Sequence, residues 1–302
     1  MFLGPTFISL WTAALLTASP SPAAEQGAAF DRAPSSRDES DERITRRTRL
    51  LIAGYTAATL AYGYNAWWEN LDTSFELRDE GWFEEDSYRG GADKFGHAYF
   101  GYASTRLLTW SFQWAGNDPL RSRRLGAALT GSLLLAVEVF DGFTEEFGFG
   151  AGDLLMNGVG IGLGWLLESH PAWDELFDFR LRYWPSDRKE REEDGTSIAE
   201  DYSGQTYLLL LKASGVPALR RHTLLRYLEV AVGYGSRGYR PERPPEERER
   251  NVYYGLSLNL SRLLDDTVFR DNARQSRAQR ATHRALELYQ IPGTAALRRH
   301  EL

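Results

Sequence analysis

The chain contains no cysteine among its 302 residues. For these residues this absence excludes disulfide bonds, zinc sites built on thiolates, cysteine nucleophiles and a lipid attached through an N-terminal cysteine. Positive charge is not in excess either, because 35 Lys and Arg stand against 42 Asp and Glu, for a net charge of −7. This balance argues against a general nucleic-acid binder. A mean hydropathy of −0.44 excludes a chain that is embedded in a membrane throughout.

The N-terminal segment 1–24 has the pattern of a secretory signal peptide. A long apolar run is followed by two prolines and by small residues, so we expect cleavage near Ala23 or Ala24. The first residues include no Lys or Arg, which leaves an uncleaved anchor as the alternative. The next segment, 25–49, is polar and of mixed charge, and we expect a disordered linker there.

Four segments then have the apolar content and length of helices, within a helical domain expected over residues 50–185. The first of them has no charged residue and ends on two tryptophans, which suits a membrane span with an aromatic anchor. A buried helix in a soluble four-helix bundle is the alternative. The last contains four glycines in an apolar context, which predicts a smooth stripe that lets a neighbouring helix approach closely. The segments are Leu50–Trp68, Asp93–Trp114, Leu125–Phe147 and Asp153–Glu168, and the glycines are Gly158, Gly160, Gly162 and Gly164.

Charge at the connections between these segments alternates in sign. Arginines precede the first helix and join the second to the third, whereas acidic residues follow the first and the third helices. An up-and-down bundle would therefore have one basic and one acidic end. The positive-inside rule would place the basic end in the cytoplasm, but a cleaved signal peptide would place the linker before the first helix in the periplasm. The two interpretations conflict, and the topology stays open.

The candidate site lies at the acidic end of this bundle. The start of the second helix, the end of the third and the start of the fourth meet at one end of an antiparallel bundle, and each of them carries polar residues spaced three or four apart on one face. Ionisable groups in apolar helices are costly unless they are paired, which makes them candidates for a function. The cluster consists of Asp93, Lys94, His97, Glu138, Asp141, Asp153 and Asn157.

Three interpretations of this cluster remain open. Its donors could bind a divalent metal through Asp93, His97, Glu138 and Asp153. It could divide acid and base roles in an enzyme, with His97, Glu138 and Asp141 as catalytic candidates. It could also be a structural network, with Asp93 and Asp153 as helix N-caps and His97 bonded to Glu138.

Three sequence elements in this region resemble those of a known family. They are Asp93-Lys94-x-x-His97, Glu138-x-x-Asp141-Gly142 and Asp153-x-x-x-Asn157-Gly158. In this order and spacing they resemble the YfiM-like family of predicted periplasmic lipoproteins, a domain of unknown function, over about residues 50–168. The last two elements are also similar, more weakly, to VanZ-like membrane proteins. The resemblance implies an envelope location and a helical domain, and it implies no reaction. Many members are lipoproteins, whereas this chain has no cysteine to acylate.

The second half of the chain changes from a helical to an alternating pattern. After a charged connector at 186–204, we expect a small antiparallel β segment over 205–266 with three strands. The segment 267–302 carries five regularly spaced arginines and is expected to be a basic tail or helix with a solvated face. The expected strands are Thr206–Leu211, Leu228–Tyr234 and Val252–Leu260, with a long exposed turn at 240–250.

Together these patterns predict an α+β chain with an N-terminal four-helix bundle, a small antiparallel β segment and a basic C-terminal helix. A bundle embedded in a membrane and a bundle in water are the two alternatives for its placement. We expect an exported, membrane-associated envelope protein whose polar cluster has a structural or ligand-binding role. An envelope enzyme acting on a lipid-linked or cell-wall substrate is the first alternative. An outer-membrane β-protein or pore component is the second, although such a pore needs at least about eight strands. A divalent metal is the cofactor considered. Membrane or envelope components are the expected partners, with self-association through the β segment and no nucleic acid.

Overall fold

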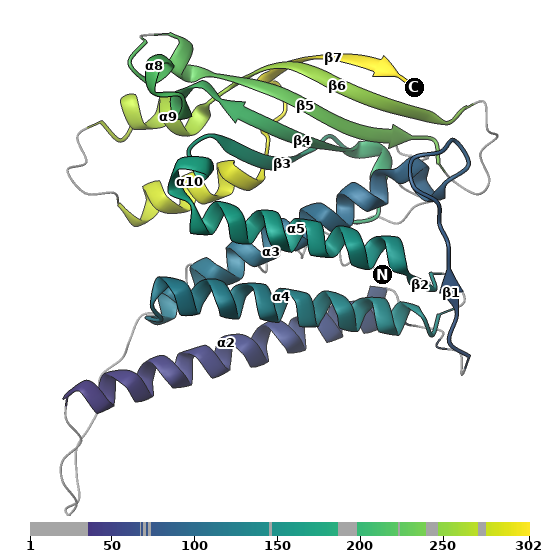
Figure 1. The fold of residues 1–302 in the computed structure, drawn as a ribbon, viewed down its shortest axis with the longest axis horizontal. Coiled ribbons are helices and arrows are strands. Elements are labelled where there is room, and N and C mark those ends of the chain that lie inside the picture. Colours follow the sequence, from purple (N-terminus) through teal and green to yellow (C-terminus); the bar gives the residue numbers. More distant parts are fainter. Residues whose placement is uncertain are drawn as a thin grey trace, which may run out of the picture.

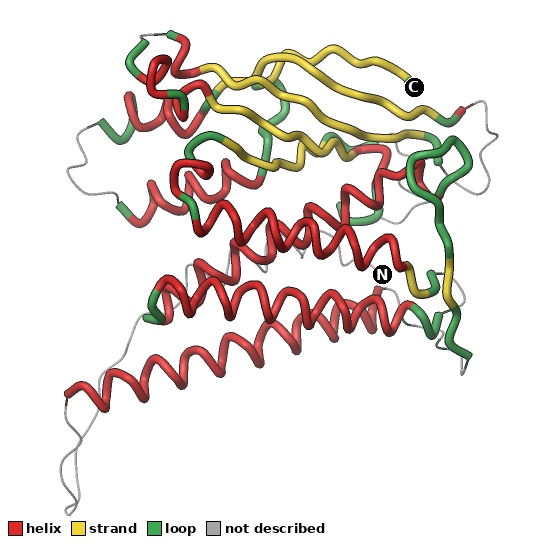
Figure 2. Tube along the Cα trace, in the orientation of Figure 1, coloured by secondary structure: helices red, strands yellow, loops and turns green. Residues whose placement is uncertain are grey.

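In the computed structural model the described residues are 36–302, apart from 67, 69–70, 72–73, 145–146, 187–197, 223, 240–246 and 271–275. Long helices from the first half of the described chain run beside one another, and an antiparallel sheet with short helices lies on one side of them (Figure 1). Figure 2 shows this division into a helical and a strand-rich part. The α+β class is therefore confirmed. The predicted signal peptide at 1–24 and most of the connector at 186–204 lie outside the described residues.

The elements follow one another along the chain in this order. The helices are α2 (Ser36–Ala66), α3 (Ala92–Ala115), α4 (Pro119–Asp141), α5 (Ala151–Ser169), α6 (Pro171–Asp174), α8 (Pro217–Arg220), α9 (Leu260–Asp266) and α10 (Arg277–Leu288). The strands are β1 (Leu77–Arg78), β2 (Phe149–Gly150), β3 (Phe177–Tyr183), β4 (Gln205–Lys212), β5 (Leu228–Arg237), β6 (Glu249–Leu258) and β7 (Ala295–Glu301).

Helix α2 begins much earlier than predicted. Residues 36–49, expected to belong to the linker, form its first half. Tertiary contacts explain the difference, because Asn117 Nδ2 donates to Thr48 Oγ1 over 2.8 Å and the Arg47 guanidinium lies 5.8 Å from the centre of the Trp114 ring. The polar start of α2 is thus held on the turn between α3 and α4.

The turn from α3 to α4 is set by local chemistry. Gly116 ends α3 with a left-handed φ of 107°, and Asp118 caps α4 by accepting a hydrogen bond from the Arg121 amide. Pro119 occupies the first position of α4, which therefore begins six residues before the predicted Leu125.

Helix α3 packs against both α4 and α5, and α2 contacts α3 and α4. The four-helix bundle in its predicted form is not confirmed. Within the part of the chain that the structure describes, no helix combines the length and the hydropathy that crossing a membrane requires.

Two of the four glycines in α5 permit its close approach to α3. A Cβ on Gly160 would lie 1.9 Å from the Ala98 carbonyl oxygen, and one on Gly164 would lie 2.9 Å from the Tyr102 carbonyl oxygen. A Cβ on Gly158 or Gly162 would meet nothing within 4 Å. The predicted stripe is therefore confirmed for Gly160 and Gly164, and the other two glycines face away from α3.

The larger sheet of the described chain has five strands, in the order β3-β4-β5-β6-β7, and every pairing is antiparallel. Strands β4, β5 and β6 are the three predicted ones. The expectation of three strands is wrong in number, because β3 lies at the end of the segment assigned to the helical domain and β7 lies in the segment assigned to the basic tail. The helix expected in that tail is present as α10.

The two faces of this sheet differ in an unusual way. One face buries charged side chains, including Arg180 on β3 and Glu229 on β5. On the opposite face of β4 to β6, seven apolar side chains stay 39 to 52% exposed: Leu209, Leu211, Val230, Val232, Tyr254, Leu256 and Leu258. The chain links the two edges of the sheet, which indicates that the sheet curls. The Gln290 backbone amide donates to the Leu181 carbonyl of β3, and β7, which starts only five residues later, pairs with β6.

The helical part and the sheet meet in an aromatic core. Tyr102 of α3 is fully buried and lies 5.7 Å, centre to centre, from the Phe179 ring of β3. Tyr207 of β4 lies beside Tyr99 of α3, whose hydroxyl donates to the Leu288 carbonyl at the end of α10. Burial of such large rings is a major part of the stabilisation that holds the two parts together.

Candidate polar site at the ends of three helices

The predicted polar cluster forms at one end of the helical part. The start of α3, the end of α4 and the start of α5 lie at the same end, beside the small parallel pair of β1 and β2 (Figure 1). Asp93, Lys94, Glu138, Asp153 and Asn157 are each no more than 5% exposed. Their convergence follows from the alternating direction of three consecutive helices, as the sequence predicts.

Lys94 lies at the centre of one half of the cluster. Its Nζ is 2.7 Å from Asp153 Oδ1, 2.9 Å from Asp93 Oδ2 and 2.8 Å from Glu80 Oε2. Glu80 was not predicted as a member, since it is one of many acidic residues in the loop before α3 and nothing local distinguishes it. Three carboxylates around one ammonium raise the pKa of Lys94 despite its burial, so this side chain stays charged.

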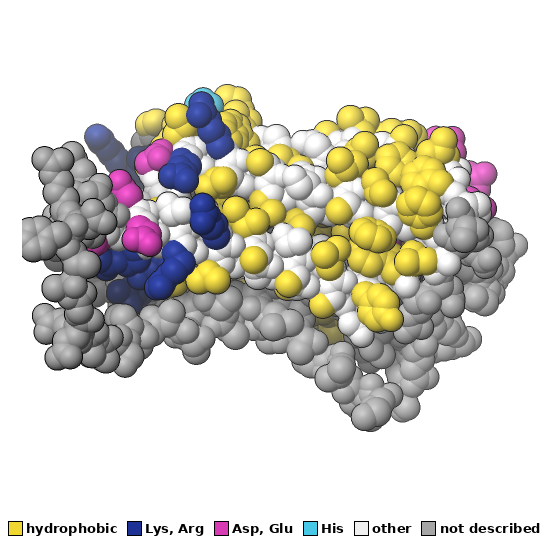
Figure 3. All heavy atoms as spheres, turned by 90° about the horizontal axis from the view of Figure 1, so that it is seen from below, with side chains coloured by type: hydrophobic (Ala, Val, Ile, Leu, Met, Phe, Trp, Pro, Cys, Tyr) yellow, Lys and Arg dark blue, Asp and Glu magenta, His cyan; other side chains and the backbone are white. Residues whose placement is uncertain are grey.

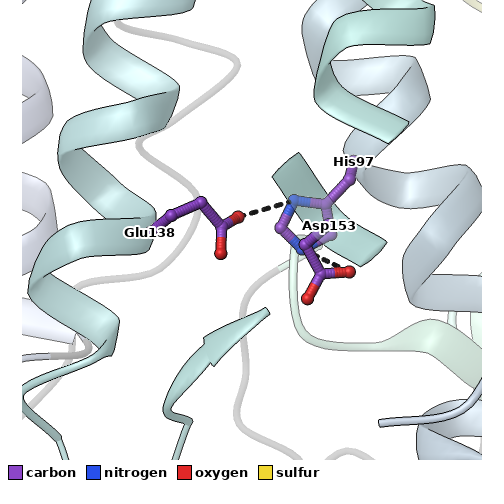
Figure 4. Close-up of side chains that lie close together, drawn as sticks. All are labelled: His97, Glu138 and Asp153. Carbon is purple, nitrogen blue, oxygen red and sulfur yellow. Dashed lines mark ion pairs between the residues drawn. The ribbon is translucent and has the colours of Figure 1, made fainter. Parts of the chain in front are cut away.

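His97 organises the other half. Its Nδ1 lies 3.3 Å from Glu138 Oε1 and 3.3 Å from Asn157 Oδ1, while its Nε2 lies 3.7 Å from Asp153 Oδ1. Figure 4 shows the ring between the two carboxylates, which come from α4 and α5. Asn157 Nδ2 also donates to Glu138 Oε1 over 3.2 Å. The His97 side chain is 27% exposed, so this half of the cluster opens toward the surface.

Asp141 occupies a separate position. Its Oδ1 accepts a hydrogen bond of 2.8 Å from the Trp68 indole, and no direct bond to His97 or Asp153 accompanies it among the described residues. Burial raises the pKa of Asp141 to about 6, although the Trp68 bond and the His97 charge act in the opposite direction. The sequence did not predict Trp68 as the partner of Asp141, because its position at the end of an apolar segment was its only distinguishing feature.

The two aspartates at the helix starts are not caps, contrary to one predicted alternative. The N-cap residues are Gly91 for α3 and Gly150 for α5, and neither helix has a side-chain cap. Gly91 is left-handed, with φ 77°, and a Cβ there would lie 2.3 Å from the Trp82 carbonyl oxygen. Glycine therefore lets the loop press against the helix start and leaves the Asp93 and Asp153 carboxylates free for the cluster.

The cluster holds more acidic than basic groups. Burial, reinforced by the Asp153 carboxylate, raises the pKa of Glu80 to about 8, and burial raises that of Glu138 to about 7. Burial also tends to raise the pKa of Asp153, but the charges of His97 and Lys94 outweigh this effect, so the pKa of this carboxyl is lowered. Burial lowers the pKa of His97, and the surrounding carboxylates more than reverse this. The electrostatics of the cluster therefore favour the binding of additional positive charge.

Two groups of three side chains have the spacing of metal ligands. One is His97, Glu138 and Asp153, and the other is Glu80, Asp93 and Asp153, and in each group the ligand atoms lie within 4.8 Å of one another. The ammonium of Lys94 already occupies the second group. The first has a mixed nitrogen and oxygen donor set and the partly exposed His97, so it is the better candidate for a bound cation.

Asp93 contributes an unusual feature to the same region. It is 1% exposed, its Oδ2 accepts from Lys94, and its Oδ1 has no hydrogen-bond partner among the described residues. A buried carboxylate oxygen without a partner is costly, and such groups are satisfied by a water, a proton or a cation.

Two further buried ion networks were not predicted. Arg106, which is 1% exposed in the middle of α3, contacts Glu168 at 3.0 Å, Glu287 at 3.0 Å and Asp174 at 2.7 Å. In the sheet, Arg180 Nη1 donates to Glu229 over 2.8 Å and Lys212 Nζ donates to Asp178 over 2.7 Å. Both networks join elements distant in sequence, and their partners could not be selected from local patterns.

These observations define an α+β protein whose helical part carries a buried polar cluster at one end. Residues 79–169, which contain all seven residues of the cluster, match the family described as predicted periplasmic lipoprotein (DUF2279). The resemblance predicted from the three sequence elements is thus confirmed for this segment, and it supports a periplasmic or envelope location. Comparison with curated proteins finds no match, and comparison with solved structures finds none.

Proposed function

We propose that this chain is an exported cell-envelope protein that binds a divalent metal ion through His97, Glu138 and Asp153. The observation that carries the proposal is the convergence of one imidazole and two carboxylates from three different helices, with ligand atoms within 4.8 Å of one another. Asn157 lies beside them, with its Oδ1 3.3 Å from His97 Nδ1, and can add a carbonyl oxygen.

The donor set favours a particular kind of metal. Imidazole nitrogen suits Zn²⁺ and other transition metals, whereas Mg²⁺ and Ca²⁺ prefer sites made only of oxygen. Three protein ligands with one further position for water are typical of zinc sites that are not purely structural. We therefore expect Zn²⁺ or Mn²⁺ to bind more tightly than Mg²⁺.

Electrostatics supports the proposal independently of the ligand geometry. Glu80, Asp93, Glu138 and Asp153 are largely buried and Asp141 is partly buried, and Lys94 and His97 are the basic side chains among them. A bound divalent cation would neutralise the remaining carboxylates without the need to protonate them. The location follows from the predicted lipoproteins that the matched segment resembles, although this chain has no cysteine for a lipid.

Metal analysis and titration test the proposal. The full chain is purified, stripped with a chelator and titrated with Zn²⁺, Mn²⁺ and Mg²⁺ by calorimetry, and thermal melting is measured in parallel. We expect binding of one Zn²⁺ or Mn²⁺ per chain and a higher melting temperature. His97→Ala and Glu138→Gln should each abolish measurable binding.

A matched control uses the separate network around Arg106. Glu287→Gln changes a partly buried carboxylate that takes no part in the cluster, and it should leave metal binding unchanged. Absence of metal binding in a folded wild-type chain would overturn the proposal. Variants at His97 and Glu138 that then lower only stability would identify the cluster as a structural network.

An enzyme acting on a lipid-linked or cell-wall substrate is a second candidate. It is favoured by the partial exposure of His97, because a metal with three protein ligands and an open side can activate water. Incubating the metal-loaded protein with purified peptidoglycan and with lipid-linked precursors, beside the Glu138→Gln variant, tests it by product analysis. Products that form equally with both proteins, or with neither, would exclude this role for the site.

A further inference from the structure

A continuous charge-free surface runs along the helical part. The described residues 50–65 of α2, 125–137 of α4 and 154–167 of α5 include no Asp, Glu, Lys or Arg. Large apolar side chains nevertheless stay exposed on these helices: Leu60 at 40% and Tyr64 at 68% on α2, Leu135 at 45% and Phe140 at 37% on α4, and Leu155 at 57% and Val159 at 52% on α5. We call these residues the apolar helix face.

One end of this face is bordered by arginines. Arg46 and Arg49 lie toward the middle of α2, and Arg121 and Arg124 lie in the first turns of α4, all of them exposed. The bond between Thr48 and Asn117 fixes this part of α2 beside the start of α4. Figure 3 shows dark blue side chains gathered at one end, with magenta ones among them, and a yellow and white surface extending away from them.

The opposite end is acidic. Exposed Glu84, Glu85 and Asp86 belong to the loop that precedes α3 at the far end of the helices. The surface thus changes from basic to apolar to acidic along the helix axes. An aromatic ring stands at each border of the apolar part, with Trp114 near the arginines and Tyr64 near the acidic end. Such rings favour the boundary between an apolar medium and water.

Exposed apolar surface of this extent is unfavourable in water. Soluble proteins rarely leave contiguous apolar patches larger than a few hundred Å² uncovered, and such patches mark contacts with proteins or membranes. A charge-free face with arginines at its border has the composition of a surface that lies on lipid, where the arginines meet anionic headgroups and the apolar side chains enter the acyl region.

We propose that the apolar helix face binds to the surface of an anionic lipid membrane, with its arginine end held at the headgroups. The proposal commits to lipid because the cluster of positive charge and the apolar residues adjoin each other on the same helices. It does not depend on the metal site, whose ligands lie at the acidic end.

Vesicle flotation with the full chain tests the proposal. The protein is mixed with vesicles of phosphatidylcholine alone or with phosphatidylglycerol added, and the fraction that floats with the vesicles is measured. We expect flotation with the anionic vesicles and weaker flotation with the neutral ones. The triple variant Leu60→Glu, Leu135→Glu and Val159→Glu should reduce flotation on the order of tenfold, since each change places a charge in the apolar region.

Two control variants separate the contribution of the apolar side chains to membrane binding from that of the arginines. Leu224→Glu, Val268→Glu and Leu302→Glu change three apolar residues that are 57 to 71% exposed outside α2 to α5, and together they should leave flotation unchanged. Arg46→Gln, Arg121→Gln and Arg124→Gln should lower flotation with the anionic vesicles to the level of the neutral ones. Thermal melting followed by circular dichroism establishes that each variant is folded.

Three results would overturn the proposal. A folded wild-type chain could fail to float with either kind of vesicle, or the triple variant of the apolar helix face could float as well as the wild type. The third result is a wild-type chain that does not float but dimerises in lipid-free solution, together with a triple variant that stays monomeric. This result would show that a second copy of the chain covers this face. The His97→Ala variant, tested beside these, should float normally whatever its effect on metal binding.

Discussion

Lys94 Nζ and Asp153 Oδ1 lie 2.7 Å apart, although 59 positions separate the two residues in the chain. The pair joins the first turn of α3 to the first turn of α5, and both side chains are buried. Asp93 and Glu80 bind the same ammonium. This contact therefore closes the acidic end of the helical part and fixes the loop before α3 on it.

Removal of the Lys94 charge should strongly destabilise the fold. Lys94→Met leaves three buried carboxylates without their shared cation, and we expect the free energy of unfolding to fall by about 3–5 kcal/mol at neutral pH, the usual effect of breaking a buried ion pair. Denaturant unfolding measures it. Arg121→Met at an exposed position serves as the control and should stay within about 0.5 kcal/mol of the wild type. Equal stability of the two variants would contradict the assigned role of Lys94.

The two kinds of glycine in α5 should respond oppositely to alanine. Gly160→Ala places a Cβ 1.9 Å from the Ala98 carbonyl oxygen, so α3 and α5 must separate, and we expect a loss of about 1–3 kcal/mol or more. Gly162→Ala meets nothing within 4 Å and should stabilise the helix by up to about 1 kcal/mol. Thermal or denaturant unfolding of the two variants checks the order. A neutral Gly160→Ala would show that the helices do not pack this closely.

Glu287 should make stability fall as the pH rises. Burial, reinforced by the carboxylates of Asp178 and Asp174, raises the pKa of Glu287 to about 7 in spite of the nearby Arg106. An unfolded glutamate titrates near about 4.3, so between these values the folded state binds more protons than the unfolded state. This contribution to stability is fully present below about pH 4 and is lost as the pH rises through about 7.

The Glu287→Gln variant isolates this effect. Its side chain does not titrate, so the stability difference between wild type and variant should change by on the order of 1–3 kcal/mol between pH 5 and pH 8, with the wild type losing more as the pH rises. Denaturant unfolding at a series of pH values measures the difference. A difference that is constant over this range would mean that Glu287 titrates normally.

Loss of a cation from the charged network of the sheet should destabilise the fold as much as loss of the Lys94 charge. Arg180→Met removes donors to Glu229 and Gln290 inside the curled sheet, and we expect a loss of about 3–5 kcal/mol. Arg298→Met on the exposed β7 should change stability by no more than about 0.5 kcal/mol. Comparison of the two midpoints of unfolding distinguishes a structural network from solvent-exposed charges. A mild Arg180→Met effect would contradict the burial of this network.

Much of the helical part could be predicted because its signals are local. Asp118, Pro119 and Gly116 mark helix ends by their own chemistry, and the apolar runs predict which segments are helical. The meeting of His97, Glu138 and Asp153 followed from alternating helix direction. Strands β3 and β7 were missed because neither has an apolar alternation that stands out: β3 carries Asp178 and Arg180 on its buried face, and most of β7 is exposed.

The sequence alone determined the absence of cysteine chemistry, the helical and strand segments with clear periodicity, and the spacing that places seven polar residues at one end of three helices. Only the tertiary structure decided which carboxylates share the Lys94 ammonium, that Asp141 bonds to Trp68 and stands apart, and that the charged face of the sheet is buried while an apolar face is exposed. The reason is physical: helix signals act over a few residues, whereas burial and ion pairing depend on residues that approach one another only after the whole chain has packed.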